Sequence, residues 1–191
     1  MKGRESGMPD EAWWASFFEP EGVLDRLCVD LPELGNIVEF GCGYGTFTLP
    51  ASRRTRGIVT ALDIDPEMVA IVERKASLAD QKNIQAKLRD FLIDGTGLAT
   101  ATQAHAMIFN LLHIEEPHSL LSEAHRTLIT DGMLSIMHWR SDIPTPLGPP
   151  LDIRPTPRHC EAWTRAAGFK HVHEISLETC CPYHFGLVAR K

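Results

Sequence analysis

Apolar residues in this chain gather in short runs that are separated by longer segments of mixed polarity. Short runs rich in aliphatic and β-branched residues, bounded by turn residues, are typical of strands. The run at 104–112 is almost entirely apolar, which suits a strand covered on both faces of a sheet. Five strands are predicted in this way, at 36–40, 57–63, 84–88, 104–112 and 133–139.

Capping residues predict helices between these strands. Asp65 is a typical N-cap residue, and Pro66 follows it at the first helical position. An amphipathic segment that opens at Pro9 precedes the first strand. The predicted helices cover 46–54, 65–79, 116–129 and 157–167, after the N-terminal helical segment, and Asp131 with Gly132 forms a turn before the fifth strand.

Strands and helices therefore alternate, which predicts an α/β fold with a mostly parallel sheet. Two further strand-like runs, 169–175 and 183–189, are separated by seven residues. Because a parallel return needs a dozen residues or more, we expect these two runs to pair antiparallel. The sequence thus predicts an αβα sandwich around a seven-stranded sheet. Six prolines between Pro144 and Pro157 preclude regular structure there and indicate a long loop.

Composition places the chain among globular proteins of one domain. Its 191 residues are 43% apolar and 23% charged, and a chain of this length buries about two thirds of its unfolded surface. The formal charge of −6 disfavours a protein that mainly wraps nucleic acid. Five cysteines without the spacing of a disulfide framework indicate reduced thiols in a cytoplasm.

The sequence predicts neither a targeting segment nor a membrane span. Residues 1–7 lack the apolar run of a signal peptide. The longest stretch without charged residues, 95–114, is too polar to cross a bilayer. We therefore expect a cytoplasmic protein without a membrane partner, present as a monomer or a homodimer.

A glycine-rich turn directly follows the first predicted strand, with Gly41, Gly43 and Gly45. Ligands of parallel sheets bind beyond the carboxyl ends of the strands, so this turn marks a candidate site. A dinucleotide-binding turn would have its third glycine at position 46, where this chain has Thr46. Glu39 lies two residues before the turn, and its carboxylate would repel a pyrophosphate but attract a cation.

Together, Glu39 and the three glycines resemble the first motif of the class I S-adenosylmethionine-dependent methyltransferase family, an acidic residue followed by G-x-G-x-G. The resemblance extends over 36–139 and includes Asp63 at the end of the second strand. It points to the small-molecule type. It implies a Rossmann-like fold with an N-terminal helical lid, and S-adenosyl-L-methionine as the cofactor. The single domain of 1–191 would comprise a cap at 1–30, a cofactor-binding core at 36–139, a substrate loop at 140–156, and a helix and strand pair at 157–191.

The same resemblance implies roles for individual residues. Asp63 would hold the ribose hydroxyls, and Ile64 would lie against the adenine. Asp90 would accept from the adenine amino group beside Phe91. The segment after the fourth strand would pass beneath the methionine portion of the cofactor. The implied cofactor-binding residues are Glu39, Gly41, Cys42, Gly43, Tyr44, Gly45, Asp63, Ile64, Asp90, Phe91, Asn110 and Leu111.

Residues after the fourth and fifth strands are expected to face a methyl acceptor. His113 and His138 are the candidate catalytic residues, either as a general base or as hydrogen-bonded polar residues without that role. Arg154 would clamp an anionic substrate or form a salt bridge within the loop. Two N-terminal aromatic residues are lid candidates or core residues. The candidate substrate residues are Trp14, Phe18, Trp139, Arg140 and Arg154.

These expectations describe methyl transfer to a small-molecule acceptor by in-line displacement, where proximity supplies most of the rate. DNA is disfavoured, because Asn110 lacks the Pro-Pro-aromatic run of amino-methylating DNA enzymes. No metal is predicted: histidines and cysteines between 159 and 184 lack zinc-site spacing, and Asp142 is alone near the fifth strand. One alternative is a non-catalytic S-adenosylmethionine-binding sensor or partner subunit. Another is a nucleotide-binding oxidoreductase, which Glu39 and Thr46 disfavour.

Overall fold

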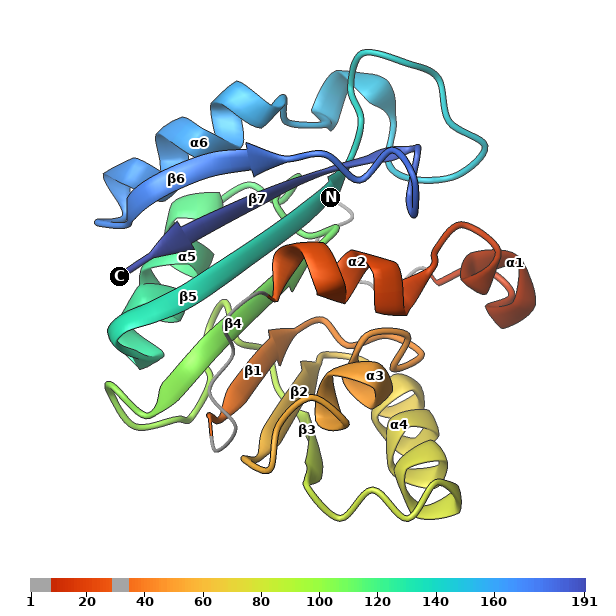
Figure 1. Cartoon of the computed structure of the whole chain (residues 1–191). Coiled ribbons are helices and arrows are strands. Elements are labelled where there is room, and N and C mark those ends of the chain that lie inside the picture. Colours follow the sequence, from red (N-terminus) through yellow and green to blue (C-terminus); the bar gives the residue numbers. More distant parts are fainter. Residues whose placement is uncertain (1–7, 29–34) are drawn as a thin grey trace.

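The computed structural model of the chain describes residues 8–28 and 35–191. One twisted sheet runs through the described residues, and helices cover both of its faces (Figure 1). The strand order is β3-β2-β1-β4-β5-β7-β6. The strands are β1 (Ile37–Phe40), β2 (Val59–Asp63), β3 (Ile84–Leu88), β4 (Gln103–Phe109), β5 (Leu128–Trp139), β6 (Lys170–Ile175) and β7 (His184–Arg190).

Strand directions follow the predicted pattern. Among the first five strands, every pair of neighbours in the sheet runs parallel: β3 with β2, β2 with β1, β1 with β4, and β4 with β5. β7 pairs antiparallel with β5 on one side and with β6 on the other. The predicted seven-stranded, mostly parallel sheet with an antiparallel C-terminal pair is therefore confirmed. β7 inserts between β5 and β6, so the last strand of the chain is not an edge strand.

Helices form the two outer layers (Figure 1). Apolar residues of α2 and α3 pack in a cluster with Ile37 and Met107 on one face, and residues of α5 and α6 pack with Val38 and Ala106 on the other. Central strands are thus buried on both faces, which explains their nearly continuous apolar runs. The helices are α1 (Glu11–Ala15), α2 (Pro20–Leu27), α3 (Thr48–Ser52), α4 (Pro66–Leu78), α5 (Pro117–Thr127) and α6 (Pro157–Ala166).

The predicted cap at Asp65 forms, and Thr156 caps a second helix. The Asp65 side chain accepts a hydrogen bond from the backbone N–H of Glu67 at 2.8 Å, at the start of α4. Thr156 accepts from the backbone N–H of His159 at 3.1 Å, at the start of α6. The loop before α6 contains one short 3₁₀ helix, η1 (Leu151–Ile153). Part of the predicted N-terminal cap, residues 1–7 and 29–30, lies outside the described residues.

Two predicted boundaries are wrong for local backbone reasons. β4 ends at Phe109, before the predicted boundary at 112, because Asn110 adopts a left-handed φ of 59°. Asp131 and Gly132 lie within β5 and form no separate turn before it. Asp131 has a φ of 60° there, and the pairing of β4 with β5 shifts register between Gln103 and His105. An irregularity inside a strand gives the same sequence signal as a turn. Within the described residues, no helix has the length and apolar character needed to cross a bilayer.

Candidate active site

A cavity of about 420 Å³ opens at the carboxyl ends of β1 to β5, where parallel sheets bind ligands. Ten of the twelve residues expected to bind a cofactor line it, and Tyr44 and Gly45 do not. Of the residues expected near an acceptor, Trp14, His113 and Trp139 line the cavity. Phe18, His138, Arg140 and Arg154 lie outside the cavity lining.

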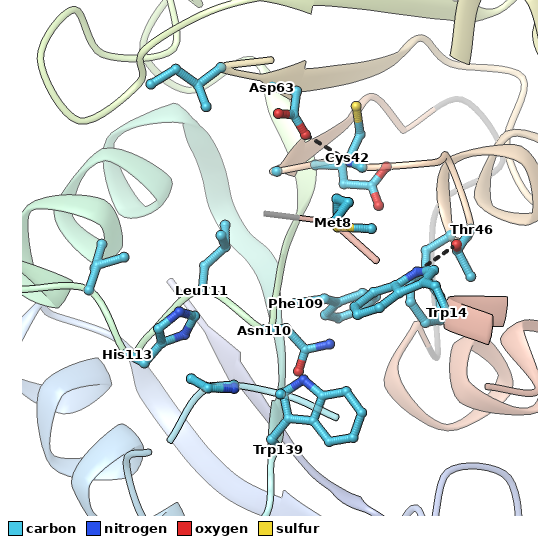
Figure 2. A pocket seen from close by; sticks show the side chains of 18 of the residues that line it. Met8, Trp14, Cys42, Thr46, Asp63, Phe109, Asn110, Leu111, His113 and Trp139 are labelled. Carbon is cyan, nitrogen blue, oxygen red and sulfur yellow. Dashed lines mark hydrogen bonds between the residues drawn. The ribbon is translucent and has the colours of Figure 1, made fainter. Parts of the chain in front are cut away.

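The two ends of the cavity differ in chemistry (Figure 2). We call one the acidic end, because Glu39, Asp63 and Asp90 line it from β1, β2 and the segment after β3. The other is the aromatic end, which α1, the ends of β4 and β5 and the proline-rich loop supply. The described residues that line the aromatic end are Trp14, Phe109, His113, Trp139, Leu147, Gly148, Pro149, Pro150 and Ile153.

The glycine-rich turn shapes the acidic end. Gly41 and Gly43 have φ values of 70° and 49°, in the left-handed region that glycine adopts without strain. A Cβ on Gly41 would lie 3.0 Å from Cδ1 of Leu111, so a side chain at this position would crowd Leu111. A Cβ on Gly45 would lie 2.9 Å from Cδ1 of Leu49, on the first turn of α3. Gly45 therefore allows close helix packing, which explains why it does not line the cavity.

Asp63 ties the turn to the end of β2. Its Oδ2 accepts a hydrogen bond from the backbone N–H of Gly43 at 2.8 Å, and its Oδ1 accepts from the backbone N–H of Asp65 at 3.0 Å. Burial raises the pKa of this carboxyl group. Each carboxylate oxygen has a second lone pair. The side chain can therefore hold the turn and still accept from a ligand in the cavity.

Glu39 is buried beneath the same turn. The Thr48 hydroxyl donates a hydrogen bond to Oε2 of Glu39. Burial, opposed by this hydrogen bond and reinforced by the charge of Asp63, raises the pKa of Glu39 to about 8. A buried carboxyl group without a cation keeps its proton, and an approaching cation favours its ionised form. The acidic end is therefore suited to a positively charged ligand, as the sequence predicts.

Asn110 occupies the boundary between the two ends. Its left-handed backbone lets its N–H donate to the carbonyl of Met137 at 2.7 Å. Its side-chain oxygen Oδ1 is buried and has no hydrogen-bond partner among the described residues. Figure 2 places this side chain between Leu111 and Trp139, at the wall of the cavity. A buried acceptor without a partner is costly, so it indicates a ligand donor at this point.

The two histidines expected to be catalytic contact each other. Nδ1 of His113 lies 3.2 Å from Nε2 of His138, and Nδ1 of His138 lies 3.1 Å from the carbonyl oxygen of Trp139. His138 is fully buried behind His113, and burial lowers its pKa to about 3. Burial and the charge of Arg154 lower the pKa of His113 as well. The structure thus brings His113, and not His138, to the cavity.

The N-terminal aromatic residues divide between the cavity and the core. The indole N–H of Trp14 donates to the hydroxyl of Thr46 at 3.1 Å, which fixes the ring at the cavity (Figure 2). Phe18 packs edge-on against Phe47, with ring centroids 5.4 Å apart, and belongs to the buried cluster. Met8, which the sequence gives no reason to single out, also lines the cavity.

Arginine side chains organise the proline-rich loop. Arg154 donates to the backbone carbonyls of Pro149 at 2.7 Å, Arg140 at 2.9 Å and Leu147 at 3.3 Å. These backbone hydrogen bonds stand in place of the salt bridge within the loop that the sequence allowed, and the clamp on an anionic substrate stays a prediction. The Arg140 side chain forms a salt bridge with Asp142 at 2.7 Å. The loop is therefore held in place beside the aromatic end.

Comparisons with known proteins agree with this architecture. Residues 37–132 match the family of methyltransferase domains. No curated protein is significantly similar in sequence. A solved SAM-dependent methyltransferase from Aquifex aeolicus shares 24% identity and a TM-score of 0.78, over 95% of this chain and 93% of that one. An S-adenosylmethionine-dependent methyltransferase from Mesorhizobium loti shares 18% identity and a TM-score of 0.65, over 84% and 94%. The [4+2]-cyclase SpnF shares 17% identity and a TM-score of 0.75, over 90% and 79%.

Proposed function

The chain belongs to the methyltransferase domain family, as a class I enzyme that depends on S-adenosyl-L-methionine, and we propose that it methylates a small-molecule acceptor by in-line displacement. The observation that carries this proposal is the shape of one cavity. Its acidic end suits a cationic cofactor. The aromatic end lies next to the acidic end within the same cavity. Two ligands bound there would lie side by side, and alignment of reacting groups lowers the barrier substantially.

We assign the cofactor-binding residues by matching their side chains to the chemical groups of S-adenosylmethionine. Asp63 and Asp90 offer carboxylate oxygens to ribose hydroxyls and to an adenine amino group, and Ile64 offers an apolar surface. The unpartnered Oδ1 of Asn110 would accept from an ammonium group of the methionine portion. S-adenosylmethionine supplies a sulfonium whose methyl carbon accepts a lone pair while the carbon–sulfur bond breaks with its electrons on sulfur.

The aromatic end would hold the acceptor and exclude water. Trp14, Phe109 and Trp139 give it flat apolar walls, and the proline-rich loop lies next to them. His113 is the titratable side chain that lines this end in the described part of the chain. For a hydroxyl or amine acceptor, His113 would receive the proton that the acceptor loses. A thiolate acceptor would need no such base.

The proposal also covers the cellular location of the protein, its oligomeric state and the roles of its segments. The five cysteines are buried free thiols in the structure, which fits a reducing cytoplasm. We propose a cytoplasmic monomer or homodimer of one domain. In it, 36–139 would bind the cofactor and 140–156 would shape acceptor choice.

Calorimetric titration with S-adenosylhomocysteine tests the cofactor site. We expect micromolar binding that Asp63→Ala weakens about 100-fold, because it leaves the N–H groups of Gly43 and Asp65 unpaired. A nicotinamide dinucleotide is the control and should bind at least about tenfold more weakly. Absent binding would contradict the cofactor assignment. Binding without turnover across an acceptor panel would favour a non-catalytic sensor or partner subunit.

A further inference from the structure

A line of hydrogen bonds connects the backbone to the aromatic end of the cavity. It runs from the carbonyl of Trp139 to Nδ1 of His138 at 3.1 Å, and from Nε2 of His138 to Nδ1 of His113 at 3.2 Å. His138 is fully buried, and both of its ring nitrogens are used in this line. His113 lines the cavity, and Nδ1 is the nitrogen that it directs to His138. The remaining nitrogen of His113, Nε2, has no hydrogen-bond partner among the described residues and can accept from a ligand.

The direction of each hydrogen bond follows from the carbonyl at its end. A carbonyl oxygen can only accept, so Nδ1 of His138 carries the hydrogen. Burial keeps the His138 ring neutral, because it lowers the pKa to about 3. Nε2 of a neutral His138 then has a lone pair, so Nδ1 of His113 must donate to it. Neutral His113 therefore has its hydrogen on Nδ1 and presents a lone pair from Nε2.

No charged side chain of the described residues lines the cavity around this lone pair, and the charge of Arg154 acts on His113 from outside the cavity lining. The charged residues that line the cavity in the described part of the chain lie in or directly after β1, β2 and β3, at the acidic end. Arg154, beside the aromatic end, is engaged with three backbone carbonyls, and its guanidinium carbon lies 5.9 Å from the Trp139 ring centroid. The Trp14 indole N–H is bonded to Thr46. A charged acceptor would lose its hydration at this end of the cavity, where no charged side chain of the described residues lies in contact with it.

Resting on the proposed function, we propose that the acceptor is an uncharged molecule with an aromatic body that donates an O–H or N–H hydrogen bond to Nε2 of His113. His138 is then a positioning residue: it fixes which nitrogen of His113 accepts. The half-buried ring of Trp14 would contact the aromatic body, and the buried rings of Phe109 and Trp139 lie behind it and keep this wall apolar. Specificity arises because a site with an unpaired acceptor rejects a ligand that lacks the donor.

Four naphthalene probes test the acceptor class, each titrated into the protein saturated with S-adenosylhomocysteine. 1-Naphthol carries a neutral donor, 1-methoxynaphthalene lacks the donor, 1-naphthoate is an anion, and 1-naphthylmethylamine is a cation at neutral pH. We expect 1-naphthol to bind about tenfold more tightly than each of the others. His113→Phe should remove the preference over 1-methoxynaphthalene. Equal or tighter binding of a charged probe, or of the methoxy probe, would overturn the proposal.

Imidazole ¹⁵N chemical shifts test the positioning role without any need for turnover. The wild-type protein should show His113 protonated at Nδ1. His138→Leu should shift the population toward the Nε2-protonated form that free histidine prefers, and His138→Gln, whose amide oxygen can accept, should restore the wild-type pattern. His173→Leu, at an exposed position on β6, is the matched control and should change nothing at His113. An Nε2-protonated His113 in the wild type would refute the role of His138.

The two failures are distinguishable. If S-adenosylhomocysteine does not bind, the proposed function fails, while the ¹⁵N pattern still reports the state of His113. If S-adenosylhomocysteine binds and the naphthalene preference is absent, the function stands and the acceptor class is wrong.

Discussion

The acidic and aromatic ends of the cavity are built from different kinds of sequence. Residues of the acidic end stand at strand ends between Glu39 and Phe91, each in a short motif next to a glycine or an acid. Residues of the aromatic end come from Trp14, Phe109, Trp139 and the loop at 147–153, which are distant in the sequence and meet only through the fold (Figure 2). Local backbone geometry governs the first end, and long-range packing governs the second.

This difference has a functional consequence. A turn shaped by left-handed glycines and closed by Asp63 offers the same backbone surface to any ligand with the matching groups. An end lined by a separate helix and a proline-rich loop can change its residues without disturbing that turn. The two ends, and with them the proposed cofactor and acceptor sites, should therefore be separable, so that single substitutions affect one end at a time.

Among the substitutions that separate the two ends, the largest effect is expected at Gly148, in the loop over the aromatic end. Its φ is 106°, and a Cβ there would lie 2.8 Å from Cδ2 of Trp139. Gly148→Ala should cost about 2–3 kcal/mol in strain and displaced loop contacts. We expect 1-naphthol affinity to fall about 30–100-fold, with S-adenosylhomocysteine affinity within about threefold of the wild-type value, both by calorimetry.

Gly168→Ala is the matched control for that substitution. Gly168 has a similar φ of 100°, and a Cβ there would lie 3.2 Å from Nε2 of His125, away from the cavity lining. It should lower the melting temperature and leave both affinities unchanged. If Gly148→Ala weakened both ligands equally, the two ends would not be separable.

The reverse pattern is expected at Gly41, in the turn of the acidic end. Alanine there would be strained at a φ of 70° and would crowd Leu111. Gly41→Ala should cost about 1–2 kcal/mol, and S-adenosylhomocysteine affinity should fall about 10–30-fold. Binding of 1-naphthol to the protein without S-adenosylhomocysteine should change less than about threefold. Gly95→Ala, at a φ of 60° outside the cavity lining, controls for strain alone.

A pH effect should distinguish the ends further. Burial raises the pKa of Glu39 to about 8, so the folded chain holds a proton that the unfolded chain has already released. The free energy of unfolding should therefore fall as the pH rises toward and through the pKa of about 8, by about 1 kcal/mol between pH 7 and 9. Denaturant unfolding of the wild type and Glu39→Gln at both pH values measures this, because the substitution removes the Glu39 contribution. Identical pH dependence in the two proteins would mean that Glu39 is already ionised.

Sequence motifs sufficed for the sheet, its order of elements and the acidic end. The five parallel strands could be predicted because burial on both faces forces apolar runs, and the turn at 41–45 could be predicted because left-handed backbone demands glycine. The end of β4 was missed because Asn110 adopts a left-handed backbone that its neighbours do not signal.

Pairing between distant side chains could not be predicted. His113 and His138 were equivalent candidates in the sequence, since both follow a strand that ends near the site. Only the parallel register of β4 and β5 puts one behind the other. Arg154 was likewise open, because its backbone carbonyl partners have no sequence signature. Long-range packing decides these roles, as it decides the aromatic end as a whole.

The smallest effect is expected where the aromatic end meets the N-terminal helix α1. Trp14→Phe keeps an aromatic wall and removes one hydrogen bond, from the indole N–H to the hydroxyl of Thr46. A partly buried neutral hydrogen bond contributes about 0.5 kcal/mol, so 1-naphthol affinity should fall about two- to threefold. Thr46→Val should produce the same loss by removing the acceptor. Because both changes break one bond, the double variant should lose no more than either single variant. Additive losses would show that Trp14 and Thr46 act independently, and not through the hydrogen bond that joins them.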